Sequence, residues 1–330
     1  MKAEDPVLRA RDAAERLGVS EGVLVEARFQ AGHVRRLPER DGGFAWILDS
    51  LKPIGRVMTL TRNDVCVHET YGAASDVATF GKMGQVTGSI DLRVFLEHWH
   101  ACYLVAETAR SGPRRSLQVF DAAGDAVIKI YVVAETDREA WDALISASAV
   151  DTGEPIAYAP VPAPVDPADD EIDMAALRDG WGALDHSHDF HRLLKDTGAG
   201  RLQALRLAGE AFAEARPQEA AIEVLEQAAE RAIQIMAFAG NRGCIQIYSG
   251  PIFTVTQMGP WLNVMDPDFH MHLRLDRVAS LWRVTKPTKL RGPITSLELF
   301  SAEGDLVLQL FGARAPGEPE NPDWRRLLSP

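Results

Sequence analysis

The chain has 330 residues and a formal net charge of −12, from 35 Lys and Arg against 47 Asp and Glu. This acid excess argues against a nucleic-acid-binding protein, because such proteins usually carry a basic stripe along one face. The absence of any run of about 18 apolar residues predicts no membrane span. The N-terminal stretch lacks the apolar core of a signal peptide. Three widely spaced cysteines, Cys66, Cys102 and Cys244, fit neither a disulfide scaffold nor a CxxC metal site and indicate the reducing cytoplasm.

In chain order, the first half is predicted to begin with helices and to continue with strands. Helical patterning covers residues 5–18 and 20–29, and short β-branched and apolar runs follow over 57–69. Residues 116–132 alternate apolar and polar side chains around Ala-Ala-Gly-Asp, which predicts a β-hairpin. Residues 151–174 contain five prolines and then an acidic cluster. Because such sequence continues neither a helix nor a central strand, it predicts a linker between residues 1–150 and 175–330.

The second half repeats the first. Residues 57–72 align without a gap with 235–250 at an offset of 178, and residues 116–132 align with 296–312 at an offset of 180. Between these blocks Arg93 aligns with Arg274 at an offset of 181. Three blocks in the same order and at nearly constant spacing indicate an internal duplication.

The remaining patterns of the second half complete the fold prediction. Helices are expected at about 186–196, 201–214 and 217–232, and strands at 245–258. Helices that are segregated from consecutive hairpins predict an α+β fold with antiparallel sheets rather than a doubly wound parallel sheet. The chain contains neither GxGxxG nor GxxxxGK[ST], so a nucleotide-binding fold has no support.

Three histidines, His186, His188 and His191, lie in one short stretch. Asp185 or Ser187 could cap the helix that follows, whose apolar side would include residues 190, 193 and 194. A single imidazole in the first turn, backed by an apolar surface, is the arrangement of a proximal haem ligand, and His188 has this position. The alternative is a capping or surface histidine.

Two His-x-His pairs offer a different chemistry. His98/His100 and His270/His272 have the spacing at which two side chains share one face of a strand, so His270 and His272 could bind one metal ion. The acids that could complete such a site are Asp266, Asp268 and Glu298. No third ligand at a recognisable spacing singles out a dedicated zinc or iron site.

Four cations lie in otherwise apolar or small-residue contexts: Arg93, Arg201, Arg274 and Lys286. Half-buried cations must be paired or must face an anionic ligand. In an acidic protein they would form a local positive pocket. The alternative is internal salt bridges with Asp91, Asp276 or Glu298. No GxSxG or HExxH motif is present, and the strand contexts of Cys66 and Cys244 indicate inert packing rather than a nucleophile.

Several long motifs resemble the hemin-degrading factor family, the cytoplasmic hemin transport and degradation proteins of Gram-negative haem-uptake systems. In the second half these are GNRGCIQIYSGP, GPWLNVMDPDFHMHLR and WRVTKPTKLRGPITSLELFSAEGD. In the first half and the middle they are LTRNDVCVHETYG, GSIDLRVFLEHW, VFDAAGDAVIKIYV and WGALDHSHDFHRLLKDTGAGRLQALRLAG. The resemblance extends from about residue 8 to residue 324. The family is itself an internal duplication, which agrees with the repeat found above.

The resemblance implies an α+β fold of two similar halves, each with a large antiparallel β-sheet and helices at one end. It also implies a haem cleft between the two halves. The iron ligand of the family falls on His188, and the arginine of its DLR block, on the opposite face of haem, falls on Arg93. By motif, Arg201 and Lys286 would meet the haem propionates or a distal water, and Phe238 and Gln309 would line the pocket. Phe311 stands where family members often carry tyrosine, so a hydrogen bond from that phenol is lost.

The resemblance also implies a function. The protein would receive haem from an inner-membrane importer in the cytoplasm. It would then either open the ring oxidatively, with an external electron donor, or deliver its cargo. The alternative is a non-catalytic carrier or store that hands haem to a separate oxygenase. A third interpretation, from another class, is a non-haem metal site at His270 and His272.

Overall fold

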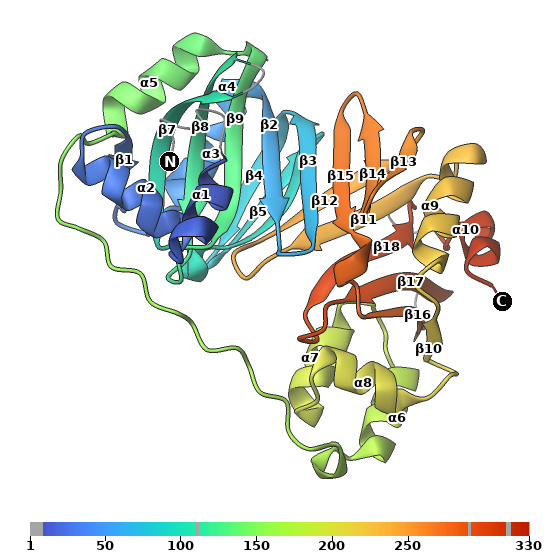
Figure 1. The fold of residues 1–330 in the computed structure, drawn as a ribbon. Helices are drawn as coiled ribbons and strands as arrows, with labels where there is room; N and C mark the ends of the chain where they lie inside the picture. Colours follow the sequence, from blue (N-terminus) through green and yellow to red (C-terminus); the bar gives the residue numbers. More distant parts are fainter. Residues whose placement is uncertain (1–8, 110–111, 290–291, 315–317, 330) are drawn as a thin grey trace.

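A computed structural model describes residues 9–109, 112–289, 292–314 and 318–329. Within these residues, two nine-stranded antiparallel sheets form the centre of the molecule (Figure 1). The first sheet has the spatial order β1 (Arg35–Leu37), β7 (Ala101–Ala109), β8 (Gly112–Phe120), β9 (Ala126–Thr136), β2 (Gly55–Arg62), β3 (Cys66–Gly72), β15 (Phe269–Arg274), β14 (Trp261–Asp266) and β13 (Val255–Met258).

The second sheet repeats this order with the corresponding strands of the other repeat. Its sequence in space is β10 (Ala213–Arg216), β16 (Ser280–Thr288), β17 (Gly292–Phe300), β18 (Leu306–Gly312), β11 (Ile235–Gly240), β12 (Cys244–Gly250), β6 (Asp91–Phe95), β5 (Met83–Gly88) and β4 (Ala74–Phe80). The α+β class, the antiparallel sheets and the duplication predicted from the sequence are confirmed.

Each sheet contains three strands from the other repeat. Strands β13–β15 join the first sheet through the β3–β15 pair, and β4–β6 join the second sheet through the β12–β6 pair. Two equivalent asparagines fix the crossing. Asn63 Nδ2 donates to the carbonyl oxygens of Gly240 and Val307 at 3.2 and 2.8 Å. Asn241 Nδ2 donates to those of Arg62 and Val127 at 2.9 and 2.8 Å.

The helices cover the sheets in separate groups (Figure 1). Those of the first repeat are α1 (Ala10–Leu17), α2 (Glu21–Gln30), α3 (Ala45–Asp49), α4 (Leu51–Ile54) and α5 (Arg138–Ser148). Those of the second are α6 (Met174–Gly182), α7 (Asp189–Thr197), α8 (Arg201–Ala208), α9 (Ala220–Glu230) and α10 (Pro322–Leu327). Short 3₁₀ turns occur at Leu96–His98, Asp169–Glu171 and Leu275–Arg277. No helix in the described ranges is long and apolar enough to cross a membrane.

Most predicted elements are present, with boundary changes that have local causes. Both predicted hairpins form, as β8–β9 and β17–β18, and their turns contain Gly124 and Gly304 at φ +84° and +87°. The helix predicted over 201–214 ends at Ala208, because Gly209 adopts φ +92° and the chain then enters β10. Residues 5–8 of the first predicted helix lie outside the described residues.

The connection between the repeats is extended. Residues 152–168 contain neither helix nor strand, and in Figure 1 this segment runs from α5 to the lower part of the molecule. There α6, α7 and α8 form a helical lobe. The lobe is fixed to the second sheet by Trp181, whose Nε1 donates to the Thr285 carbonyl at 3.0 Å and whose ring packs against Phe190 at 4.4 Å.

Candidate functional site

A fully buried carboxylate, Glu298 on β17, is the centre of a polar cluster on the second sheet. Arg201 donates to both of its oxygens, from Nε to Oε2 and from Nη2 to Oε1, each at 2.8 Å. Lys286 Nζ lies 3.2 Å from Oε1, and Ser296 Oγ and Gln309 Nε2 each donate to that atom at 3.0 Å. Residues from α8 and from three strands thus converge on one carboxylate, which we call the Glu298 cluster.

Ion pairing within the cluster opposes the effect of burial on its charged groups. Burial acts to raise the pKa of Glu298, but the adjacent Arg201 and Lys286 outweigh it and hold this pKa far below its usual value. Burial lowers the pKa of Lys286, and the Glu298 charge opposes that effect. When all three groups are ionised, two cations and one carboxylate leave a net charge of +1. The cluster is therefore able to attract one further anionic group.

Aromatic rings surround the two cations. Lys286 Nζ lies 4.7 Å from the ring centroid of Phe190, and Arg201 Cζ lies 5.2 Å from the same centroid. The Phe311 ring is 5.9 Å from Lys286 Nζ and packs edge-on against Phe238 at 5.2 Å. Cations at such distances from a ring face are attracted to it. Five of the residues implied by the family resemblance are thus brought into one neighbourhood: Arg201, Phe238, Lys286, Gln309 and Phe311.

Arg93 lies on the same face of this sheet, although it belongs to the other repeat. Gln309 pairs with Phe238, and Phe238 pairs with Ile247 on β12. Ile247 in turn pairs with Asp91 on β6, two residues before Arg93. Paired residues share a face of the sheet, and so do residues two apart on a strand. Across the sheet, Arg93 is therefore three strand spacings, or about 14 Å, from the strand of Gln309, and four spacings from the strand of Glu298.

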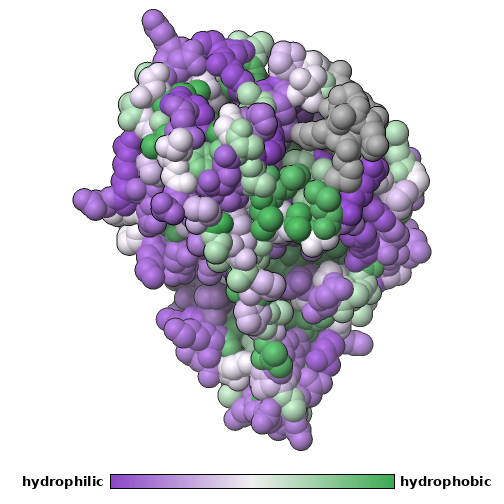
Figure 2. Space-filling view, turned by 60° about the vertical axis from the view of Figure 1, so that its left-hand side comes forward, coloured by the Kyte–Doolittle hydropathy of each residue, from purple (hydrophilic) through white to green (hydrophobic). Residues whose placement is uncertain are grey.

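Between the helical lobe and β6, this face is only partly covered. The lobe buries Val284 and Phe300 on β16 and β17. Further along, four apolar side chains are only half-buried: Met236, Phe238, Ile245 and Phe311. We call these four the open face. Figure 2 shows hydrophobic residues gathered around a hollow in the middle of the molecule. Apolar side chains left this accessible favour an apolar ligand.

His188 lies in the helical lobe. It is the N-cap residue of α7, its side chain is exposed, and it makes no side-chain capping hydrogen bond. The predicted caps, Asp185 and Ser187, are wrong, because the helix begins one residue after His188 and has no side-chain cap hydrogen bond. Phe190, two residues after His188, contacts both cations of the Glu298 cluster. His188 is therefore two residues from a side chain that contacts the cluster, and its imidazole has no capping role.

Internal ion pairs, the alternative for the four cations, are all present. The pairs are Arg93–Asp91, Arg274–Asp276, Arg201–Glu298 and Lys286–Glu298. The last two are buried and share their acid. The Arg93 side chain is 33% exposed, and its acid is only two residues away on the same strand. Arg93 therefore keeps access to solvent and to a ligand on the open face.

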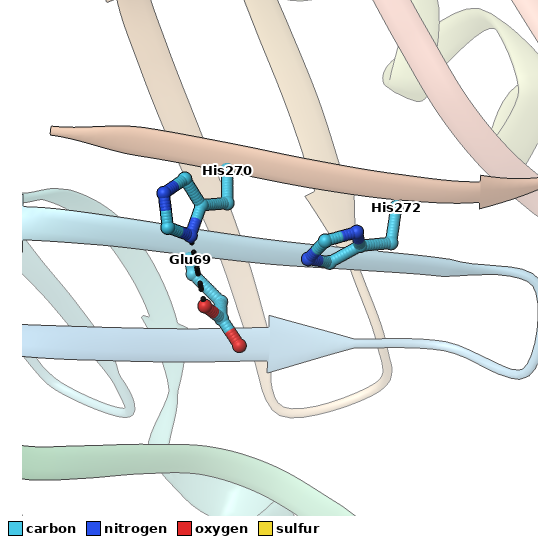
Figure 3. Close-up of side chains that lie close together, drawn as sticks. All are labelled: Glu69, His270 and His272. Carbon is cyan, nitrogen blue, oxygen red and sulfur yellow. Dashed lines mark hydrogen bonds and ion pairs between the residues drawn. The ribbon is translucent and has the colours of Figure 1, made fainter. Parts of the chain in front are cut away.

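His270 and His272 lie on the first sheet, away from the open face. They come within 4.8 Å of a carboxylate oxygen of Glu69 on β3, and all three side chains are half-buried (Figure 3). The sequence suggested three other acids as the third ligand: Asp266, Asp268 and Glu298. This prediction is wrong, because each of these acids has other partners. The other pair is not of this kind, since His100 Nε2 lies 2.9 Å from the Ala157 carbonyl oxygen.

Sequence reasoning did not recognise Glu298 as the centre of a site, nor Phe190 as a contact of both cations. A signal for Glu298 existed. It is the one charged residue in the strand sequence GPITSLELF, and a charge in a central strand must have a buried partner. The expected packing role of the cysteines agrees with the structure: burial raises the pKa of both the Cys66 and the Cys244 thiol to about 12.

Comparison with known protein families identifies the family of this chain. A family model described as the haemin-degrading HemS.ChuX domain matches residues 18–148 and again residues 198–330. The chain belongs to this family. The two matches fall one in each repeat, as expected from the internal duplication. The family resemblance inferred from the motifs is confirmed.

Relatives and solved structures in this family match along nearly their whole length. The hemin transport protein HmuS of Yersinia pestis is 36% identical over 332 residues, which cover 99% of this chain and 94% of that protein. The crystal structure of holo-PhuS, a heme-binding protein from Pseudomonas aeruginosa, has a TM-score of 0.93 and 45% identity, covering 99% and 94%. The heme degrading enzyme ChuS of Escherichia coli O157:H7 has a TM-score of 0.91 and 33% identity, covering 99% and 95%.

Proposed function

We propose that this protein binds haem on the open face, between His188 and Arg93. The observation that carries the proposal is the row of half-buried apolar side chains beside the Glu298 cluster, on the sheet face that carries the accessible Arg93. Haem is a flat apolar plate with two carboxylates at one edge. Such a ligand needs apolar walls, a nitrogen ligand and cations, and the open face with its surroundings supplies all three.

The residues have distinct roles in this proposal. His188 binds the iron, and Phe238 and Phe311 form apolar contacts with the ring. Arg201 and Lys286 hold the carboxylate edge through the net positive charge of the Glu298 cluster, in which Gln309 takes part. Arg93 would donate a charge-assisted hydrogen bond to a polar group of the bound ligand. These residues fit haem, since none of the roles requires breaking the bidentate pair of Arg201 with Glu298.

Two outcomes for the bound haem follow from the family. In the first, haem supplies the oxygen chemistry of its own oxidative degradation, while the protein binds it, orients it and donates polar contacts from Arg93. In the second, the protein is a carrier that hands haem to a separate oxygenase. One observation favours the second: Phe311 has no hydroxyl, and its neighbours are the ring of Phe238 and the ammonium of Lys286.

The setting of the protein is part of the proposal. We place it in the cytoplasm, where it would receive haem from an inner-membrane importer. An external electron donor would be needed for degradation, and a downstream haem oxygenase for the carrier role. The support is the hemin transport description of the relatives from Yersinia.

A titration of the purified protein with hemin tests the binding site. One equivalent should produce a Soret band typical of histidine ligation, and His188→Ala should lower the affinity at least tenfold and alter the band. His186→Ala is the matched control, because it removes a neighbouring exposed imidazole and should leave the titration unchanged. An unchanged spectrum and affinity in His188→Ala would exclude His188 as the iron ligand. If hemin affinity were lost in His186→Ala alone, His186 would be the ligand.

A second experiment separates degradation from delivery. The protein is loaded with haem under anaerobic conditions and then exposed to O2 with a reductant other than ascorbate, with catalase present to remove peroxide. Loss of the Soret band with stoichiometric tetrapyrrole product supports the enzyme. An intact spectrum, together with transfer of haem to an added haem oxygenase, supports the carrier.

A further inference from the structure

A group of metal-ligand type lies on the first sheet, outside the proposed haem site. His270 and His272 are two residues apart on β15 and share a face, and β15 pairs with β3 so that His270 lies opposite Glu69. In Figure 3 both imidazoles project from β15 on the side where Glu69 lies. The three ligand atoms lie within 4.8 Å of one another. Two imidazoles and one carboxylate are thus grouped by strand exchange.

The hydrogen bonds of His272 leave its Nε2 as the atom with a lone pair. Its Nδ1 lies 2.7 Å from Oδ1 of Asn263. The Asn263 amide nitrogen donates to the carbonyl oxygens of Thr256 and Trp261 at 3.2 and 3.4 Å, so its oxygen is the acceptor. His272 must therefore donate from Nδ1. A hydrogen bond from the second ring nitrogen to an amide or carboxylate oxygen is how proteins orient metal-binding histidines.

The group is also accessible. The side chains of His270 and Glu69 are 24% and 21% exposed, and His270 Nδ1 is 3.3 Å from Glu69 Oε2. A transition metal at about 2.0–2.2 Å from each ligand needs ligand atoms within about 3.5 Å of one another. The ligand atoms now lie within 4.8 Å of one another, so side-chain rotations that move them by about an ångström would bring them to this distance. No backbone movement is needed, since the strand pairing already sets the three Cα positions.

The duplication gives this position a counterpart. At the offset of 178, Val67 and Glu69 correspond to Ile245 and Ile247. His272 and His270 lie opposite Val67 and Glu69, as Arg93 and Asp91 lie opposite Ile245 and Ile247. In the strand pairing, His270 and His272 are therefore the counterparts of Asp91 and Arg93, which replaces the alignment of Arg93 with Arg274. Asp91 and Ile247 pair on the face of the second sheet that carries Arg93. The two repeats therefore present equivalent faces, and where one carries the Arg93–Asp91 pair the other carries two histidines and a glutamate.

We propose that Glu69, His270 and His272 form a binding site for a divalent transition metal ion, separate from haem. Two nitrogen ligands and one oxygen ligand suit Zn²⁺ and Fe²⁺ and leave at least one coordination position open to water or a small anion. Hard cations such as Mg²⁺ prefer an all-oxygen set and would bind poorly here. The proposal does not depend on haem binding.

Calorimetric titration of the full chain with Zn²⁺ tests the site. The wild-type protein should bind one equivalent, and Mg²⁺ should give no saturable signal. Glu69→Gln, His270→Ala and His272→Ala should each weaken Zn²⁺ binding at least tenfold. Asn263→Ala should weaken it by about tenfold or more, through loss of the hydrogen bond that orients His272. Anaerobic titration with Fe²⁺ then shows which of the two metals binds more tightly.

The controls separate this site from other histidines. His98→Ala is the matched control, because His98 is an imidazole 3.9 Å from the carboxylate of Glu97 but lies outside the group of Glu69, His270 and His272. This variant should leave Zn²⁺ binding unchanged. His188→Ala should still bind Zn²⁺, and His272→Ala should still bind hemin with the affinity of the wild type. The proposal is wrong if Zn²⁺ binding is absent in the wild type, or if it survives in both His272→Ala and Glu69→Gln. The conservative Glu69→Gln keeps the test valid should an alanine variant unfold.

Discussion

Replacement of Glu298 by glutamine would remove the charge on which the Glu298 cluster depends. Glutamine has nearly the same shape, but it leaves Lys286, which is only 3% exposed, and Arg201 without an anionic partner. Removal of one partner from a buried ion pair destabilises a protein by about 3–5 kcal/mol, because the remaining charge is buried without compensation. We therefore expect Glu298→Gln to lower the free energy of unfolding of the haem-free protein by about 3–5 kcal/mol at pH 7.5.

The assay is urea unfolding of wild type and variant as a function of pH. The pKa of Glu298 in the folded protein lies below its ordinary value of 4.5, so this carboxylate stabilises the fold above pH 4.5. That stabilisation is lost as the pH falls below 4.5 toward the folded-state pKa, because the unfolded chain then binds the extra proton. The difference between wild type and Glu298→Gln should therefore shrink under acidic conditions.

Asp142→Asn is the control for this experiment. Asp142 pairs with Arg115 at 3.1 Å in an exposed setting, with 61% of its side chain accessible, so its replacement should change stability by no more than about 1 kcal/mol. A loss below about 1 kcal/mol in Glu298→Gln at pH 7.5, or a difference that does not depend on pH, would refute the view that Glu298 is an ionised hub.

Three further predictions concern other parts of the molecule. Arg93→Ala should leave hemin affinity within about threefold of wild type but change the ferric absorption spectrum and the rate of autoxidation; identical spectra would exclude Arg93 from the pocket. His68 is fully buried, and burial lowers its pKa from 6.5 to about 3. As the pH falls from 6.5 to 3, the unfolded chain binds a proton at this imidazole that the folded protein does not, so the stability of the wild type should decrease by about 1.4 kcal/mol per pH unit at most. His68→Leu should remove that slope in urea unfolding measured across the range, and an unaltered slope would contradict the assignment. Asn241→Ala should lower the free energy of unfolding by about 2–3 kcal/mol in the same measurement, because the backbone groups bonded to its side chain lose their partner. A decrease under about 0.5 kcal/mol, which is the error of additivity, would show that the crossing of the sheets does not depend on Asn241.

The repeat, the hairpins and the antiparallel class were predictable because they depend on local signals. Alternation around Gly124 and Gly304 specifies a hairpin within 17 residues, and an offset of 178–181 shows duplication without any structure. Residue identity and motif were also sufficient to select the basic and aromatic residues around Glu298. All of these signals lie within short stretches of chain.

The strand exchange was not predictable from these patterns. Alternation identifies a strand and its buried face, but it does not select which neighbour a strand takes at a separation of some 200 residues. Glu69 as the partner of His270 follows only from the β3–β15 pair. The same limit concealed that Arg93, in the first repeat, lies on the sheet of the second. The hub role of Glu298 likewise required the positions of Arg201 and Lys286 on separate elements.

The exchange of β4–β6 and β13–β15 makes the chain equivalent to a strand-swapped homodimer whose two subunits have been fused. A single repeat would contribute three strands to a partner and would need three in return, so it could complete its sheets only by association with a second copy. The extended segment over residues 152–168 replaces that bimolecular step by an intramolecular one, and completion of the sheets no longer depends on protein concentration. Once the two copies are joined, each is free to diverge, and the equivalent faces of the two sheets have become chemically different.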